Sequence, residues 1–524
     1  MCCKRVFVLA VLLMISTAST ARTQGFRFLE ATIDDVHASL MSGEITCHAL
    51  VQRYLNRIDA YDKNGRELNA VQYVNPSALQ EADELDAELA ISGLVGPLHC
   101  IPVLLKDQVE TRDMPTTYGS VIFKDFVSER DATIVVRMKE AGAIILAKTN
   151  MGEFASRYVG SGFGVIRNAY DPNRNPSGSS GGTGTAVAAN FGMVGIGEDT
   201  GGSIRGPAAV SNLVGVRPTV PLVSRFGMMP AKPANDTLGP MTRTVRDAAI
   251  LLEVLAGYDP NDPITAYAIG QVPASYTKFL DSEGLVGARI GVIREPMDPD
   301  TDPTSDDYKK VRTVLDRAID DLKALGAHVV DPVVVPNLKT VKEISAGNNF
   351  ETEGAMNAYL AEHRNAPVKT VREILLLGQV TPWRASGLMN LVGRSTEDIG
   401  YLRVLMAKET LRRNVLKVMA DGQLDALVYG TFDHQASVIA TDALTNADTE
   451  DAYALGNNRD LSPFIAFPAL TVPAGFTTDE LPVGLEFLGR PFTEGTLLGL
   501  AYAYEQGTHR RRPPATAPPL PSQP

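Results

Sequence analysis

Cysteine, histidine and tryptophan are scarce in this 524-residue chain, which contains 4, 7 and 1 of them. Two of the cysteines stand at positions 2 and 3, which leaves Cys47 and Cys100 for the rest of the chain. Two cysteines in so long a chain do not form a disulfide scaffold, and the sequence leaves open whether they pair or remain buried thiols. No histidine pair has HExxH spacing or adjoins a CxxC motif, so we expect no metal site.

Excess basic charge and long apolar runs are also missing. The formal net charge is -12 and the pI is near 5.2. Such a surface repels a phosphate backbone, so we expect no nucleic-acid partner. No run after the N-terminal segment reaches the roughly 18 apolar residues of a membrane-spanning helix, so we expect no stable membrane anchor.

The N-terminal segment is typical of a secretory signal peptide. A basic pair precedes an apolar run at residues 6–15, and Ser19 and Ala21 supply small residues for cleavage. The apolar run would span only about 15 Å as a helix, against the ~30 Å of a bilayer core. We therefore expect residues 1–21 to be removed and the protein to be secreted or periplasmic.

Alternating strand and helix patterns predict an α/β fold. Residues 101–105 form a short apolar strand, residues 131–141 a helical pattern and residues 143–146 a second strand. Residues 289–335 repeat this alternation, which favours layers of helix and sheet.

The chain shows no internal repeat and no strong linker. The simplest organisation is one domain over residues 22–510, with a mostly helical, variable region at about 337–425. Thr32 and Asp35 predict a capping box at the start of an early helix. Residues 511–524 are Pro-rich, and we expect a flexible tail there.

Two glycine-serine clusters, at residues 177–182 and 200–203, enclose an apolar helix and strand over residues 183–197. Two glycines before Ser203 allow successive backbone N–H groups to turn toward one point beside the hydroxyl. Such donors are what an oxyanion needs. On its own, however, a Gly-Gly-Ser is typical of a tight turn with an ordinary helix cap.

The sequence offers no convincing histidine as the base that a serine nucleophile needs. The first cluster matches GxSxG, but a turn-rich loop precedes it, and the only histidine candidates are His434, beside Asp433, and His509. Neither cluster continues as a phosphate-binding P-loop. Lys106 directly follows five apolar residues, so burial could lower its pKa, although a surface lysine at a strand end fits the same spacing.

Three segments together resemble the amidase signature family: residues 96–107 (GPLHCIPVLLKD), 175–182 (NPSGSSGG) and 199–205 (DTGGSIR). Further agreement lies at residues 147–151, 215–219, 236–241 and 482–485. The resemblance runs from about residue 32 to 495. Within the family, the chain resembles secreted bacterial-type amidases and relatives of peptide amidase and fatty acid amide hydrolase. A departure lies at residues 463–469 (PFIAFPA), where many members have Asn and Leu-x-Gly before Pro-Ala.

The resemblance implies a fold and a set of site residues. The fold would be a central mixed sheet of about eleven strands, covered by helices on both faces, with the signature core at about 95–250. Ser203 would be the nucleophile, Lys106 the base and Ser179 the bridging serine after a cis Gly178–Ser179 bond. The remaining roles fall on the oxyanion hole, formed by the backbone N–H groups of Thr200, Gly201, Gly202 and Ser203, and on the supporting residues Gly178, Ser180, Asp199 and Arg205.

The resemblance also implies an activity. The protein would hydrolyse a small-molecule carboxamide to a carboxylic acid and ammonia or an amine, through an acyl-enzyme on Ser203 and without a metal or cofactor. Because Lys106 must be neutral to act as a base, we expect the carboxylate of Asp107 to point away from it. The alternative is a glutamine-dependent amidotransferase component of the A type, which a signal peptide disfavours.

Substrate and assembly stay open at this stage. We expect the substrate pocket to come from residues 109–118, 226–233 and parts of 345–435. The oligomeric state, monomer or homodimer, is not predicted.

Overall fold

The computed structural model of the chain describes residues 26–449, 452–453 and 455–521. The predicted signal peptide lies outside these residues. Among the residues that are described, no helix is long and apolar enough to cross a membrane.

Thirteen strands occur in the described residues. They are β1 Val71–Val74, β2 Pro102–Lys106, β3 Ile144–Thr149, β4 Val159–Gly160, β5 Gly164–Val165, β6 Val194–Asp199, β7 Val214–Arg217, β8 Thr237–Thr242, β9 Arg289–Ile293, β10 His328–Val333, β11 Ala426–Gly430, β12 Ala469–Phe476 and β13 Pro482–Leu488. Eleven form one sheet in the order β1-β3-β2-β6-β8-β7-β12-β13-β11-β9-β10. The pairs β3-β2, β2-β6, β11-β9 and β9-β10 are parallel and the others antiparallel, which confirms the predicted mixed sheet.

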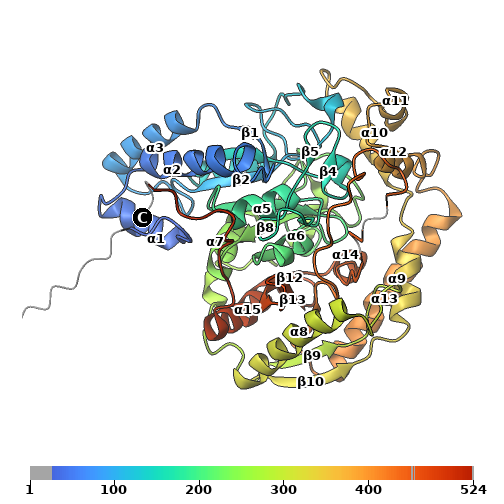
Figure 1. The fold of residues 1–524 in the computed structure, drawn as a ribbon. Helices are drawn as coiled ribbons and strands as arrows, with labels where there is room; N and C mark the ends of the chain where they lie inside the picture. Colours follow the sequence, from blue (N-terminus) through green and yellow to red (C-terminus); the bar gives the residue numbers. More distant parts are fainter. Residues whose placement is uncertain (1–25, 450–451, 454, 522–524) are drawn as a thin grey trace, which may run out of the picture.

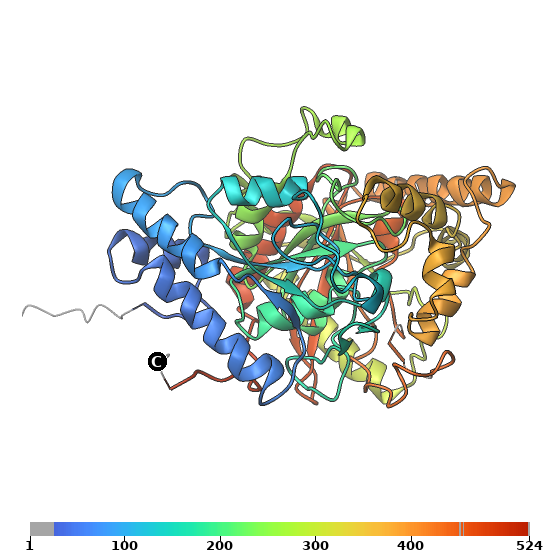
Figure 2. The same ribbon diagram turned by 90° about the horizontal axis from the view of Figure 1, so that it is seen from above.

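Helices cover both faces of this sheet, as Figures 1 and 2 show. They are α1 Ile33–Met41, α2 Cys47–Ile58, α3 Ala78–Ser92, α4 Thr133–Glu140, α5 Gly181–Ala188, α6 Arg205–Val210, α7 Val245–Leu255, α8 Asp306–Ala324, α9 Leu338–Ala346, α10 Thr352–Glu362, α11 Val371–Leu376, α12 Pro382–Met389, α13 Ile399–Asp421, α14 Leu461–Ile465 and α15 Glu494–Thr508. Helices α5 and α6 pack on the central strands, and both are buried over their whole length. An all-round apolar or small-residue surface is what such a central helix requires.

The early helices follow from their sequence signals. Thr32 and Asp35 form the predicted capping box at the start of α1. Helix α2 buries Leu50, Val51 and Tyr54 against the core. At its first residue, Cys47 forms a disulfide with Cys100, with Cα atoms 5.6 Å apart, so the question that the sequence left open is answered.

The region at 337–425 is helical, as predicted, and contains α9 to α13. These helices gather at the opposite end of the molecule from α1 to α3 (Figure 1). Part of this region closes a separate apolar cluster that includes Tyr118, Phe123, Met356 and Tyr359. The variable region is therefore packed against the core through its own set of side chains.

The described part of the C-terminal tail is not free of the body, in contrast to our expectation for residues 511–524. The buried guanidinium of Arg57 donates to the backbone oxygens of Ala517 and Pro518, and Arg511 pairs with Glu30. Proline lacks a backbone donor but keeps its carbonyl acceptor, so a Pro-rich segment can satisfy a buried arginine. Composition alone did not reveal these partners.

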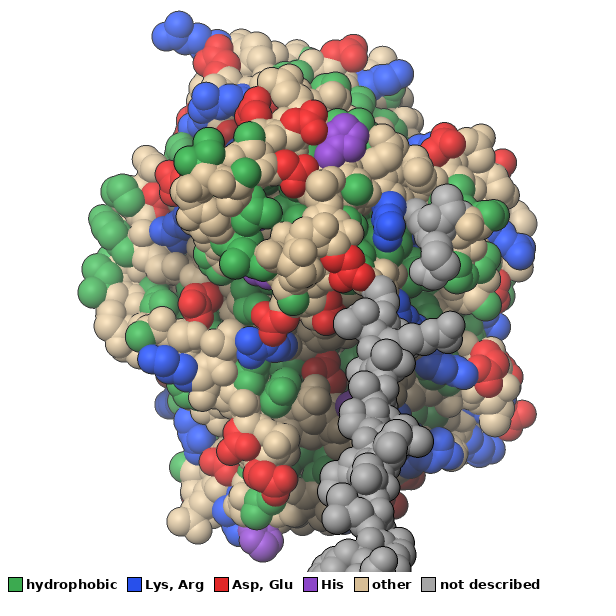
Figure 3. Space-filling view, turned by 90° about the vertical axis from the view of Figure 1, so that its left-hand side faces the viewer, with side chains coloured by type: hydrophobic (Ala, Val, Ile, Leu, Met, Phe, Trp, Pro, Cys, Tyr) green, Lys and Arg blue, Asp and Glu red, His purple; other side chains and the backbone are tan. Residues whose placement is uncertain are grey.

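The face in Figure 3 carries Lys and Arg side chains interspersed with Asp and Glu rather than gathered by sign.

Candidate active site

The candidate residues meet at the carboxyl ends of two neighbouring parallel strands. Lys106 is the last residue of β2, and Asp199 is the last residue of β6. Ser179 lies just before α5, whose residues pack on both strands. In open α/β sheets this edge of the strands is where ligands bind.

Lys106 and Ser179 are in direct contact. The Nζ of Lys106 lies 2.7 Å from the Oγ of Ser179, and neither residue is exposed to solvent. The Gly178–Ser179 peptide bond is cis, as the resemblance implied. A Cβ on Gly178 would lie 1.7 Å from the backbone oxygen of Arg157, so only glycine fits there. The chain therefore holds the Ser179 hydroxyl against the amine in a tightly packed turn.

Ser203 lies in the loop between β6 and α6 and is 8 % exposed. Its carbonyl accepts a hydrogen bond from the backbone N–H of Ser180 at 3.4 Å, which joins the two serine loops. Gly202 has a φ of 102°, and a Cβ on it would lie 2.4 Å from the side chain of Arg459. Glycine is therefore required at the turn before the serine.

The backbone donors of this loop are divided between two tasks. The N–H of Gly202 donates to Asp199 Oδ1 at 2.7 Å, so it is not free to bind an oxyanion as the resemblance implied. The N–H groups of Thr200, Gly201 and Ser203 have no hydrogen-bond partner among the residues that the structure describes. These three donors belong to the loop that carries Ser203.

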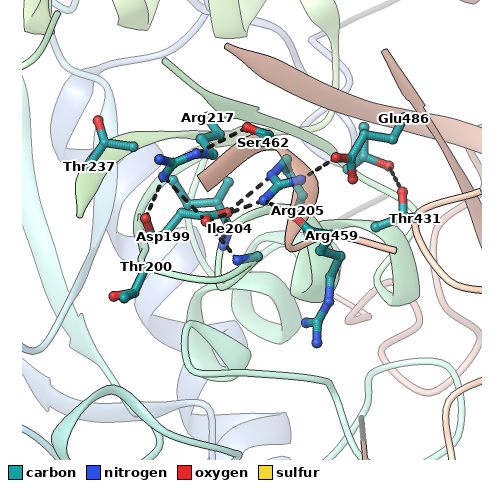
Figure 4. Close-up of polar contacts among 12 residues, drawn as sticks. Asp199, Thr200, Ile204, Arg205, Arg217, Thr237, Thr431, Arg459, Ser462 and Glu486 are labelled. Atoms are coloured by element: carbon teal, nitrogen blue, oxygen red, sulfur yellow. Dashed lines mark hydrogen bonds and ion pairs between the residues drawn. The ribbon is translucent and has the colours of Figure 1, made fainter. Parts of the chain in front are cut away.

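A buried ion network holds the loop in place (Figure 4). Asp199 also accepts from the backbone of Ile204 and pairs with Arg205 at 3.2 Å and Arg217 at 3.4 Å. Arg205 in turn pairs with Glu486 of β13. All four charged side chains are fully buried, and each has an opposite charge to offset its loss of hydration.

The network fixes the charge of its members. Burial by itself would raise the pKa of Asp199, but Arg205 and Arg217 hold it well below its usual range. Burial lowers the pKa of Arg217 to about 10. Asp199 is therefore an anion at any working pH and supports the loop rather than exchanging protons.

Lys106 has a further neighbour that sequence reasoning missed. Glu198 lies beside it, with Oε2 at 2.9 Å and the backbone oxygen at 3.2 Å from Nζ. Asp107 does point away, as expected, because its carboxylate accepts from the backbone and hydroxyl of Thr117. Burial lowers the pKa of Lys106, and the carboxylate of Glu198 opposes that shift.

A second carboxyl group lies near this pair. Asp236 accepts backbone hydrogen bonds from Ala231 and Lys232, and burial together with the charge of Glu198 raises its pKa to about 6. The hydroxyl of Thr200 donates to Glu198 Oε1 at 2.6 Å. Glu198 stands beside a quoted motif and Asp236 within one. For Glu198 the available signal was a carboxylate near the end of the apolar strand β6.

The structure does not place His434 as the base of a serine nucleophile. His434 pairs with Asp307 at 2.8 Å and makes no hydrogen bond to any serine in the described part of the chain. Ser180 instead exchanges hydrogen bonds with the backbone of Glu198. Within the described ranges, no group of three or more His, Cys, Asp or Glu residues could hold a metal ion.

A cavity of about 240 Å³ lies between Asp236 and the variable region. Its lining includes Phe226 and Pro233 from one loop and Ala355 and Tyr359 from α10, so two of the three expected segments contribute. A smaller apolar recess lies beside it. Tyr118, three residues at 229–231 and Met356 come from the three expected segments, whereas the other lining residues, Gln108, Met151, Phe154 and Ala155, lie outside them.

Comparison with known proteins agrees with this geometry. The Amidase family profile matches residues 49–498. A native peptide amidase from Stenotrophomonas maltophilia has a solved structure that is 36% identical with a TM-score of 0.83, covering 94% of this chain and 100% of that one. A "Probable amidase" of Arabidopsis thaliana is 32% identical over 96% of this chain and 95% of its own length. The A-type component of the glutamyl-tRNA(Gln) amidotransferase of Syntrophus aciditrophicus is 33% identical over 92% and 99%.

The chain therefore belongs to the amidase family, which confirms the resemblance seen in its motifs. It is an enzyme of the amidase class, which acts on carbon–nitrogen bonds.

Proposed function

We propose that this chain hydrolyses carboxamides through an acyl-enzyme on Ser203, with Lys106 as the base and Ser179 as the proton relay. The observation that carries the proposal is the 2.7 Å contact between Lys106 Nζ and Ser179 Oγ in a fully buried site whose second serine loop holds Ser203. A lysine in such surroundings loses part of its preference for the charged form.

The cycle begins when neutral Lys106 takes the proton of Ser179 while Ser179 takes that of Ser203. Ser203 Oγ attacks the amide carbon, and the free N–H groups of Thr200, Gly201 and Ser203 stabilise the tetrahedral oxyanion. The lysine proton then returns through Ser179 to the leaving nitrogen, and the C–N bond breaks. Water repeats these steps on the ester, releases the acid and restores Ser203.

The cavity beside Asp236 and the apolar recess indicate the kind of substrate. The recess has a volume of about 10 Å³ and is lined mainly by Met, Phe, Tyr and Pro side chains, so it suits only a small apolar group. The larger cavity adds Arg130 and Glu362 at its wall, which suit a polar or peptide-like group. We therefore place amides with one apolar and one polar substituent, including peptide C-terminal amides, among the substrates to test.

An independent hydrolase is favoured over an amidotransferase component. The solved peptide amidase gives a TM-score of 0.83, whereas the A-type amidotransferase component from Thermotoga maritima gives 0.69. We also propose a secreted or periplasmic location, supported by the N-terminal sequence and by a disulfide of the kind that persists in oxidising compartments.

The test is a hydrolysis screen of the purified chain without any partner protein. C-terminally amidated peptides, aryl amides and glutamine are incubated with the protein, and ammonia or amine release is measured. We expect release from amides with the chain alone, no loss of activity with EDTA, and none with Ser203→Ala. Release only from glutamine, and only in the presence of partner proteins, would support the amidotransferase alternative.

The location is tested by the N-terminus of protein recovered from its natural compartment. We expect it to begin near Arg22. An intact Met1 in a cytosolic fraction would contradict secretion.

A further inference from the structure

The amine of Lys106 has three polar neighbours, and two of them belong to one residue. They are Ser179 Oγ at 2.7 Å, Glu198 Oε2 at 2.9 Å and the Glu198 backbone oxygen at 3.2 Å. The side chains of Lys106 and Glu198 are both fully buried. Bulk solvent therefore does not reach these hydrogen-bonding groups.

The number of bonds decides the direction of the lone pair. A neutral amine has two N–H donors and one lone pair, whereas carbonyl and carboxylate oxygens only accept hydrogen bonds. The two Glu198 oxygens therefore take both N–H groups, and the third direction, toward the Ser179 hydroxyl, is left for the lone pair. We propose that Glu198 is a positioning residue that aims the lone pair of Lys106 at Ser179. This inference rests on the proposed function.

Glu198 is itself held on both sides. Its Oε1 accepts from the hydroxyl of Thr200, in the nucleophile loop, at 2.6 Å. Its backbone N–H and C=O both bond the Oγ of Ser180, next to the bridging serine, at 3.3 and 3.2 Å. The residue thus connects both serine loops and the base, so its geometry is fixed by three separate segments.

The charge of Glu198 gives this role a measurable consequence. Carboxylates that act on Lys106 are Glu198, Asp199 and Asp236. Asp199 is offset by Arg205 and Arg217, and Asp236 has a pKa near 6. Of the three, only Glu198 contacts the amine. An anion at this distance favours the protonated form of Lys106, so Lys106 loses its proton and becomes a base only at higher pH.

The test measures the rate at which a fluorophosphonate labels Ser203 as a function of pH. This reaction needs an activated Ser203 but no knowledge of the natural substrate. In the unsubstituted protein the rate should rise with pH as Lys106 loses its proton, and then level off. Glu198→Gln keeps an oxygen acceptor for the amine but removes the charge. We expect its rise to move to lower pH by about 1 unit or more, with a plateau within about fivefold.

Glu198→Ala removes the acceptor as well as the charge. Its plateau rate should fall by about tenfold or more, because the amine loses the bond that orients it. The matched control is Glu494→Gln, which makes the same change at a buried carboxylate that accepts from the backbone of Thr219 and does not touch Lys106. This control should leave both the plateau and the pH of the rise unchanged.

Folding of each variant is checked by circular dichroism and thermal unfolding. If Glu198→Ala does not fold, the pH profile of Glu198→Gln decides alone. An unshifted rise in Glu198→Gln, or a plateau of folded Glu198→Ala within twofold of the unsubstituted protein, would overturn the inference. Failure of the proposed function is separate, since it would show as labelled Ser203 without hydrolysis of any amide in the panel.

Discussion

At the scale of single residues, catalysis depends on the protonation state of Lys106. An exposed lysine with a pKa near 10.4 is more than about 99 % protonated at pH 7 and has no lone pair to offer. Burial lowers the pKa of Lys106, and Asp107 leaves the amine free by bonding Thr117 instead. The activity on amides should therefore rise with pH as Lys106 deprotonates and reach a plateau on the alkaline side.

Substitution of Lys106 separates its role in proton transfer from a role in packing. Lys106→Ala should lower amide turnover by about 10³-fold or more, because no group then accepts the proton of Ser203 or returns a proton to the leaving nitrogen. Activated esters should lose less, because their leaving group needs no proton. Lys106→Arg should give no rescue, since guanidinium stays charged at working pH.

These rates are measured side by side on an anilide and on the matching nitrophenyl ester. His434→Ala is the control, because His434 pairs with Asp307 away from the serines. Near-normal amide turnover in Lys106→Ala together with its loss in His434→Ala would show that the base is wrongly assigned.

The site residues differ in how far the sequence could place them. Lys106, Ser179 and Ser203 could be placed because they stand in motifs that resemble a family. The partners of Glu198, Arg217 and Glu486 could not be predicted, because they lie on other strands or helices and only the folded molecule brings them together. The role of the Gly202 amide was also not predictable, since its bond to Asp199 depends on the path of the loop.

At the scale of elements, the strands and helices of the signature core follow their sequence patterns closely. The apolar run at 101–105 corresponds to β2, and the glycine-serine clusters flank α5 and β6. The C-terminal segment was less predictable. Composition indicated a flexible tail, but the buried guanidinium of Arg57 donates hydrogen bonds to backbone carbonyl groups of this segment.

The departure at residues 463–469 creates a strained helix end. Ala466 caps α14 with a φ of 59°, in the left-handed region that favours glycine. Ala466→Gly should raise the free energy of unfolding by up to about 1 kcal/mol, because glycine adopts this conformation without a Cβ clash. Thermal unfolding of the two proteins measures the change.

The matched control is Ala87→Gly, at an exposed position inside α3. The same substitution there should lower the stability by about 0.5–1 kcal/mol, because an α-helix favours alanine over glycine. Equal destabilisation by both substitutions would contradict the assignment of strain to Ala466.

At the scale of the whole molecule, one covalent link joins the N-terminal helices to the catalytic sheet. The disulfide between Cys47 and Cys100 ties the start of α2 to the turn that precedes β2, and both cysteines are fully buried. The sequence permitted this pairing but did not require it, because proximity arises only when α2 packs on the core. A cross-link over this separation stabilises a fold mainly by restricting the unfolded chain.

Removal of the disulfide should therefore lower stability without changing the catalytic residues. We expect the Cys47→Ser, Cys100→Ser double variant to lose about 2–4 kcal/mol of unfolding free energy. Thermal unfolding with and without a reductant measures the loss, and the reductant should have no effect on the double variant. Equal unfolding temperatures for the two proteins would contradict a stabilising disulfide.

The central claim, an acyl-enzyme on Ser203, is tested most directly by stopping amide turnover in acid and locating the acyl group by peptide mass spectrometry. We expect the mass of the acyl group on the peptide that contains Ser203, and its absence from Ser203→Ala. Ser179 and Ser180 should be unmodified, because the first relays protons and the second bonds the backbone of Glu198. An acyl group on Ser180, or amide turnover that persists in Ser203→Ala, would contradict the claim.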